Sequence, residues 1–290
     1  MLSFKTLVWK NLFLVAILLF ASLSVSIVST FAQSAPEDVA KALIAAEDSN
    51  NVDAAVANFA SDAVVTLADG SKYDTADGVR GWQQALADGH FRLEPVNMQV
   101  DGNIVSWTGN ISLDAFRNLG IATLDGNWKL DIENGKIKTF DFTFTPDALT
   151  ALTAGSIVAT LVGAEAAHDV DTAVAQFAPD AVVTLADGSV DDTPAKIRAW
   201  QQELADGKFH LEPVARYVDG DTVNMNGTIA LDAFRGLGIA SLGGIWKVVV
   251  KNGKIETFDF SFTPAGLSTL QAALAAMATP EATPEATASS

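Results

Sequence analysis

The segment AVVTLADGS occupies residues 63–71, and the same nine residues return at 181–189. Each copy has the pattern of a short strand followed by an Asp-Gly turn. A shift of 118 positions also aligns the flanking sequence without gaps, and roughly two-thirds of the aligned positions over 59–146 are identical. A unit of about 100 residues is long enough to bury its own core. The sequence therefore predicts two copies of one domain, at 36–150 and 151–278.

Each copy combines helical and strand periodicities. In the first copy, apolar residues recur at helical spacing over 37–59 and 75–89. Four alternating segments follow, with DG at 101–102 and NG at 134–135 as hairpin turns. Pro95 interrupts the first of these segments and predicts a bulge there. The expected fold class is α+β, with two tandem cone-like domains that each pack about three helices on a curved, mostly antiparallel sheet.

The composition excludes several classes of function. Acidic residues outnumber basic ones by 35 to 18, and the net charge of −17 argues against nucleic-acid binding. The chain has no cysteine, which excludes disulfides, thiol catalysis and thiolate metal sites. Its three histidines lack the spacing of a helical zinc site. We therefore expect neither a metal nor a cofactor.

The two ends of the chain differ from the middle. Lys5 and Lys10 precede a long apolar run and then small residues, which predicts a signal peptide at 1–32 with cleavage after Ala32. An uncleaved N-terminal anchor is the alternative, because the run is nearly long enough to span a bilayer. In both cases the folded part is expected to be secreted or extracytoplasmic. Residues 279–290 repeat Pro, Glu, Ala and Thr and predict a disordered tail.

Several motifs together carry a resemblance to a known family. DAAVANFASDAVVTLADG at 53–70, the following W…LADG, the NGKI hairpin and the aromatic last strand resemble the SnoaL-like group of the nuclear-transport-factor-2-like superfamily. The resemblance implies a conical pocket between helices and sheet, and functions that range from isomerases, cyclases and epoxide hydrolases to members that only bind. It also implies that the two halves pair through their sheets as an intramolecular pseudo-dimer. Such pairing would involve residues in or near Thr139, Thr143, Thr257 and Ser261.

The implied pocket is expected to be lined mainly by aromatic side chains. The candidate ligand-binding residues are Phe59, Trp82, Trp107, Trp128 and Phe142 in the first half, and Phe177, Trp200, Arg216, Met225, Trp246 and Phe260 in the second. Two of these positions differ between the copies, since Trp107 becomes Met225 and Met98 becomes Arg216. The two pockets are therefore expected to differ in volume and polarity. Arg216 is expected to be paired, exposed or in contact with an anionic ligand.

The same alignment tests the family's acid–base chemistry. The tyrosine and aspartate positions of the isomerase branch fall on Leu43 and Leu67, and leucine cannot transfer a proton. The remaining catalytic candidates are the charged pairs Asp114–Arg117 and Asp232–Arg235, whose other interpretation is a salt bridge that closes a loop. We expect no carboxylate to face the cavity without an arginine partner. An unpaired carboxylate with a raised pKa would instead favour an enzyme.

Three classes of function remain open at this stage. The missing acid–base residues favour an exported, non-catalytic module that binds a small apolar or amphipathic ligand in the conical pocket. A cofactor-independent lyase, isomerase or hydrolase of the SnoaL-like type is the first alternative, with the Asp–Arg pairs as its candidate groups. A structural or interaction domain at the cell surface is the second.

Overall fold

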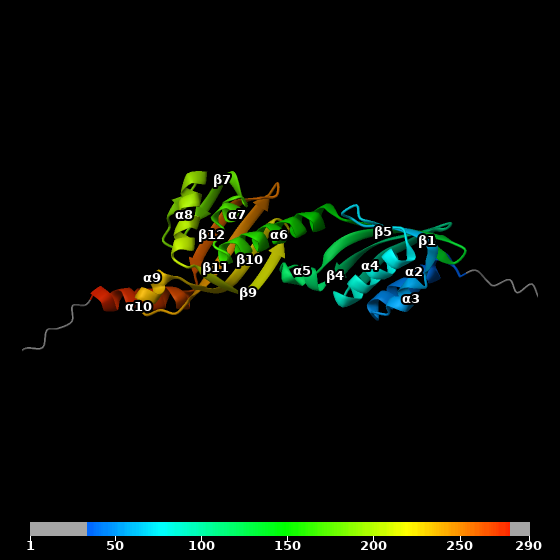
Figure 1. Cartoon of the computed structure of the whole chain (residues 1–290), viewed down its shortest axis with the longest axis horizontal. Coiled ribbons are helices and arrows are strands. Elements are labelled where there is room, and N and C mark those ends of the chain that lie inside the picture. The colour runs from blue at the N-terminus through cyan, green and yellow to red at the C-terminus, as the bar shows by residue number, and fades with distance from the viewer. Residues whose placement is uncertain (1–33, 279–290) are drawn as a thin grey trace, which may run out of the picture. The chain divides into compact units, whose positions relative to one another are not determined.

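The computed structural model describes residues 34–278. The predicted signal peptide at 1–32 and the predicted tail at 279–290 lie outside the described residues. The described part holds two α+β units with the same order of elements, as the sequence repeat predicts. Both units are shown in Figure 1.

The first unit begins with two helices and continues with strands and shorter helices. Its elements are α2 (Pro36–Asp48), α3 (Val52–Val56), β1 (Phe59–Thr66), β2 (Lys72–Tyr73), α4 (Ala76–Asp88), β3 (Arg92–Asp101), β4 (Ile104–Ser112), α5 (Asp114–Asn118), β5 (Leu124–Glu133) and β6 (Lys136–Phe144).

Helix α6 (Pro146–Ala166) follows and leads into the second unit. The remaining elements are α7 (Val170–Val174), β7 (Phe177–Thr184), β8 (Val190–Asp191), α8 (Pro194–Asp206), β9 (His210–Asp219), β10 (Thr222–Ala230), α9 (Asp232–Gly236), β11 (Leu242–Lys251), β12 (Lys254–Phe262) and α10 (Pro264–Ala278).

Each unit contains one six-stranded sheet covered by helices. The first sheet has the order β2-β1-β6-β5-β4-β3, and the second repeats it as β8-β7-β12-β11-β10-β9. Only the pairs β1–β6 and β7–β12 are parallel. In the first unit, α2 packs on β3, β4 and β5, and α4 packs on β1, so the helices cover one face of the sheet (Figure 1).

The face under the helices forms the core, as strand alternation predicts. Val105 and Trp107 on β4 are buried, as are Leu130 and Ile132 on β5. The register places Trp107 beside Trp128, and Trp128 beside Phe142 on β6. Each fully buried side chain of this size contributes about 1.5–3 kcal/mol relative to the exposed state. This row of aromatic side chains is the wall on which the candidate site is built.

Three local features differ from the expectation. Pro95 itself stays in register with Gly109, and the bulge lies further on, between Val96 and Gln99. The two-residue strand β2 was not anticipated, because a pairing this short leaves no periodic pattern. The segment from Asp114 to Asn118 is a short helix rather than an irregular loop. None of these differences alters the α+β fold class.

Helix α6 belongs to both units. The helix spans Pro146–Ala166, so the expected domain boundary at 150/151 falls inside it. α6 packs on β5 of the first sheet and on β9, β10 and β11 of the second. A further link is the hydrogen bond that the Val218 amide donates to the Gly120 carbonyl at 3.1 Å. The expected pairing of the two halves through their sheets stays a prediction. The side chains of Thr143 and Ser261, which this pairing would involve, are exposed.

Candidate functional site

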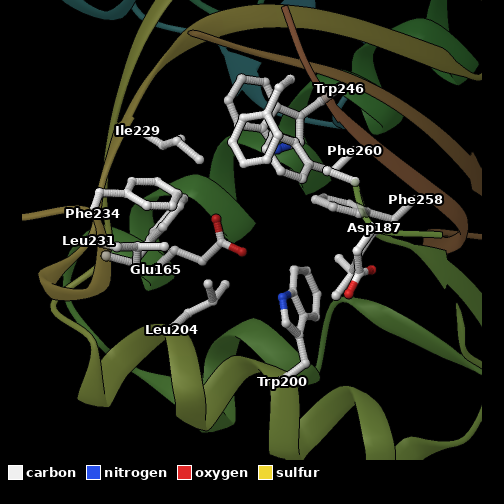
Figure 2. A pocket seen from close by; sticks show the side chains of 14 residues that line it. Glu165, Asp187, Trp200, Leu204, Ile229, Leu231, Phe234, Trp246, Phe258 and Phe260 are labelled. Atoms are coloured by element: carbon white, nitrogen blue, oxygen red, sulfur yellow. The ribbon is translucent and has the colours of Figure 1, made fainter. Parts of the chain in front are cut away.

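Each unit encloses a cavity between its helices and the helix-covered face of its sheet. The second cavity has a volume of about 270 Å³, and Figure 2 shows the side chains around it. It is lined by Glu165, Leu185, Ala186, Asp187, Trp200, Leu204, Phe209, Ile229, Leu231, Phe234, Trp246, Phe258, Phe260 and Phe262. The first cavity is smaller, at about 110 Å³. Its lining is Glu47, Leu67, Trp82, Leu86, Phe91, Ile111, Leu113, Phe116, Trp128, Phe140, Phe142 and Phe144.

One glutamate faces each of these otherwise apolar cavities. Glu47 lies in the last turn of α2, one turn after Leu43 on the buried face, and Glu165 takes the matching place near the end of α6. Their relative exposures are 6% and 8%. In Figure 2 the Glu165 carboxylate projects into the space between Trp200, Phe234 and Phe260.

A glutamine holds each glutamate in place. The Gln83 side-chain amide on α4 donates a hydrogen bond to Oε1 of Glu47 at 2.7 Å, and Gln201 on α8 does the same for Glu165 at 2.9 Å. Both glutamines are themselves buried, at 2% relative exposure. No described residue forms an ion pair with either glutamate. The carboxyl groups are therefore supported by neutral donors alone.

Burial sets the protonation of both glutamates. Removal from water raises the pKa of Glu165 to about 7, although the hydrogen bond from Gln201 partly opposes the shift. Burial likewise raises the pKa of Glu47 to about 7, against the hydrogen bond from Gln83 and with a smaller contribution from the charge of Asp48. A carboxyl group with this pKa can both accept and donate a proton near neutral pH.

The expectation that no carboxylate faces the cavity without an arginine is therefore wrong. Both glutamates were overlooked because a glutamate near a helix end is usually solvated. A signal was nevertheless present in the sequence. Glu47 follows Leu43 at the spacing of one helical turn, and the second copy keeps the same pair as Leu161 and Glu165.

The indole groups supply the hydrogen-bond donors of the second cavity. Trp200 on α8 packs against Phe177 and Phe258, with ring centroids 6.1 and 5.2 Å apart. In Figure 2 its indole nitrogen lies on the side of the ring that faces Glu165. An indole N–H donates and cannot accept a hydrogen bond. The site thus combines a carboxyl group that exchanges protons with a neutral donor across the cavity.

Six of the predicted ligand-binding residues line a cavity. They are Trp82, Trp128 and Phe142 in the first unit, and Trp200, Trp246 and Phe260 in the second. Phe59 and Phe177 instead pack edge-on behind the indoles of Trp82 and Trp200. Trp107 stacks on Trp128 at 5.8 Å, and Met225 is buried in the equivalent place. These four residues therefore support the cavity walls without forming part of the lining.

Arg216 lies outside the lining of the second cavity. It is half-buried on β9, where its Nη2 lies 3.9 Å from the sulfur of Met225 and its Nε has no hydrogen-bond partner. Burial lowers the pKa of its guanidinium. Its side chain packs close to Gly120, where a Cβ atom would lie 2.7 Å from Cγ of Arg216. Arg216 is therefore only partly exposed, and it forms no ion pair with any residue that the structure describes.

The Asp–Arg pairs are not part of the lining of either cavity. On α5, Asp114 forms ion pairs with Arg117 and with His90, whose Nδ1 is 2.6 Å away. The hydrogen bond from His90, followed by that from Arg117, holds the pKa of Asp114 below its usual range. The second copy repeats this pattern on α9, where Asp232 pairs with Arg235 and Lys208. Their side chains are 44–48% exposed, and ion pairs at such sites usually serve local structure.

A comparison with known protein families matches part of the chain. Residues 158–258 match the family model described as SnoaL-like domain. No curated protein sequence gives a significant match. Within the described residues, no cluster of His, Cys, Asp or Glu could hold a metal ion.

Several solved structures are similar to part of the chain. An NTF2-like protein of unknown function from Cytophaga hutchinsonii is 16% identical, with 40% of this chain and 94% of that chain covered and a TM-score of 0.34. A polyketide cyclase, so named provisionally, from Sinorhizobium meliloti is 23% identical, with 37% and 94% covered and a TM-score of 0.33. A provisionally named ketosteroid isomerase from Kribbella flavida is 16% identical, with 40% and 82% covered and a TM-score of 0.35.

Proposed function

We propose that this chain, in which residues 158–258 match the SnoaL-like domain model and the first unit repeats the same order of elements, is a cofactor-independent acid–base catalyst. The substrate is a small, largely apolar molecule with an acidic C–H group next to a carbonyl. The observation that carries the proposal is Glu165, which is buried at the wall of an aromatic cavity and has a pKa of about 7. A group with this pKa is divided between its acid and base forms at neutral pH.

The geometry supports a proton transfer in two steps. The ionised Glu165 accepts the proton from carbon, and the electron pair of the broken C–H bond moves onto the carbonyl oxygen as an enolate. The Trp200 indole N–H donates a hydrogen bond to this oxygen, where negative charge develops. In a substrate that carries a C=C bond conjugated to this enolate, the carbonyl then re-forms, the C=C bond moves into conjugation with it, and the protonated Glu165 returns the proton to the far carbon of the original C=C bond. The product is an isomer, so the cycle consumes no oxidant, reductant or cofactor.

A second candidate function is binding without catalysis, which the sequence favoured. It is supported by the sparse polar lining: the donors among the lining side chains are the indole N–H groups of Trp200 and Trp246. The proposed mechanism uses the Trp200 indole alone, and one neutral donor stabilises an enolate less than a set of two or three. In this case Glu165 would accept or donate a hydrogen bond that orients an apolar ligand.

Hydrogen–deuterium exchange into 2-tetralone distinguishes the two functions. We expect the wild-type protein to accelerate exchange at the carbons beside the carbonyl, and Glu165→Gln to reduce the enhancement by at least about 100-fold. Glu47→Gln, the matched change in the smaller cavity, should leave the rate unchanged. Calorimetric binding of 2-tetralone should survive in Glu165→Gln. Binding with exchange only at the solvent rate would reject catalysis and favour the binding function.

We also propose that the protein acts outside the cytoplasm. The proposal rests on the order of charged, apolar and small residues in 1–32. Expression of the full chain in a bacterial host, followed by N-terminal sequencing of the exported protein, tests it. A new N-terminus at Gln33 is expected, and full-length protein retained in the cytoplasm would contradict it.

A further inference from the structure

The two cavities differ in size although their linings match. Every lining residue of the first cavity has the same residue type at the matching position of the second. The volumes are nevertheless about 110 Å³ and about 270 Å³. An apolar cavity of about 150 Å³ is enough to hold benzene. The second cavity is thus large enough for a ring-containing ligand and the first is not, although the matched lining positions carry the same residue types.

Tyr73 supplies an aromatic ring next to the lining residue Trp82 that the second unit lacks at the matching position. Its ring stacks on Trp82, with centroids 6.3 Å apart and planes inclined by 18°. Trp82 is consequently buried, at 7% relative exposure. The matching residue in the second unit is Asp191, whose side chain has no aromatic ring to stack on Trp200. Trp200 is partly exposed. The second lining also extends to Ala186 and Asp187 in the loop after β7, whereas the first does not reach the matching loop residues.

A second difference accompanies the tyrosine. Gly78 lies beside the tyrosine, because a Cβ atom there would be in van der Waals contact with Cβ and Cδ1 of Tyr73 at 3.6 Å. The second copy has Lys196 at this position. Its Nζ bonds to Asp192 at 2.9 Å instead of covering Trp200. The two units therefore differ beside Trp82 and Trp200: the first has Tyr73 and Gly78 there, and the second has Asp191 and Lys196.

The charges around the second cavity restrict the ligand. Its described lining holds two carboxyl groups, Glu165 and Asp187, and no basic side chain. Hydrogen bonds from the Ser189 hydroxyl and amide hold the pKa of Asp187 below its usual range, so this group is ionised at neutral pH. An anionic group inside the cavity would be desolvated without a cationic partner, which is costly. A neutral or cationic molecule meets no such penalty.

We propose that the second unit alone takes a ligand, that Tyr73 closes the first, and that the ligand is a neutral or cationic molecule with an apolar ring system. The position shared by Tyr73 and Asp191 is then the determinant of access. This inference concerns the same cavity as the proposed function and rests on it for the role of Glu165. Occupancy does not require turnover, however, so a binding experiment separates the two.

The experiment uses the full mature chain and a matched pair of fluorescent probes. N-phenyl-1-naphthylamine is neutral, and 1-anilinonaphthalene-8-sulfonate has the same skeleton with an added sulfonate. We expect the neutral probe to bind the wild type at one site per chain, and the sulfonate to bind at least about tenfold more weakly. Energy transfer from tryptophan to the neutral probe should fall in Trp200→Phe and persist in Trp82→Phe.

The decisive variants exchange the residues at these two positions between the units. Asp191→Tyr combined with Lys196→Gly should weaken binding of the neutral probe at least about tenfold, because a ring now covers Trp200. Tyr73→Asp combined with Gly78→Lys should raise the stoichiometry to two sites, and Tyr73→Phe should keep it at one. Thermal unfolding of each variant confirms that both units remain folded.

Four results would overturn the inference: two sites in the wild type, no saturable binding of the neutral probe, equal affinity for the sulfonate, or unchanged binding in Asp191→Tyr with Lys196→Gly. Glu165→Gln separates this inference from the proposed function. If Glu165→Gln retains probe binding and exchanges 2-tetralone at the wild-type rate, catalysis by Glu165 is rejected. The proposal that Tyr73 closes the first cavity would still stand.

Discussion

Replacement of Glu165 by glutamine should stabilise the protein at pH 8 and leave its stability nearly unchanged at pH 4. Glutamine has the shape of the protonated glutamate and can still accept the hydrogen bond from Gln201, which lies 2.9 Å from the carboxyl oxygen. The two side chains differ mainly in that glutamine cannot ionise. The change therefore isolates the cost of a buried negative charge.

The sign follows from the two pKa values. The ordinary value is 4.5 and burial raises the pKa of Glu165 to about 7 in the folded protein. Between these values the folded state holds a proton that the unfolded state has released, so stability falls as pH rises from about 4.5 to about 7. Each unit of pKa difference corresponds to about 1.4 kcal/mol, so the loss is complete above pH 7 at about 3 kcal/mol. Glu165→Gln removes this loss.

Urea unfolding followed by tryptophan fluorescence between pH 4 and pH 8.5 measures the effect. The difference in unfolding free energy between Glu165→Gln and wild type should be near zero at pH 4 and reach about 3 kcal/mol at pH 8. Glu47→Gln should behave in the same way, since its pKa is also raised to about 7. Glu203→Gln, at an exposed position of α8, is the control and should show no pH-dependent difference. A constant difference across this range, or a less stable Glu165→Gln at pH 8, would refute the buried charge.

Other expected outcomes follow from the same geometry. The rate of 2-tetralone exchange should rise with pH through an inflection near 7, as titration of Glu165 requires, and a flat profile would contradict its role as the base. Gln201→Leu removes the donor that favours the ionised carboxylate, so the inflection should move to higher pH. In Gly244→Ala the new Cβ would overlap the ring of Trp246 and lie 2.8 Å from Phe260, so the unfolding free energy should fall by about 1–3 kcal/mol. Gly163 lies on a helix with open space around it, so Gly163→Ala should raise the unfolding free energy by about 0.5–1 kcal/mol. Asp232→Asn, in an exposed ion pair outside the cavity, should leave exchange and probe binding unchanged.

Strand alternation made the fold predictable from residues alone. Trp128, Leu130 and Ile132 alternate with polar neighbours, and in the structure they lie buried on one face of β5. Such a pattern is local, because one face of a strand meets the core and the other meets solvent. Strand alternation also predicts the wall residues Trp128 and Trp246, whereas helical spacing on α4 and α8 predicts Trp82 and Trp200.

The chemistry of the site was not predictable in this way. The environment of Glu165 is set by side chains far apart in sequence: Gln201 binds it from α8, and rings from β11 and β12 shield it from water. No local pattern encodes that convergence. The partial burial of Arg216 was unpredictable for the same reason, because Arg216 packs against Gly120, which lies far from it in the sequence.

By itself, the sequence determined that one α+β domain occurs twice and which side chains of each strand face the core. Periodicity and duplication can be read from the order of residues alone. Tertiary structure alone decided that Glu47 and Glu165 lose their water, that Tyr73 covers Trp82, and that Trp200 stays partly open. The physical reason is that desolvation and access depend on which surfaces meet in space. Two cavities with identical lining residues can therefore differ in volume and in what they admit.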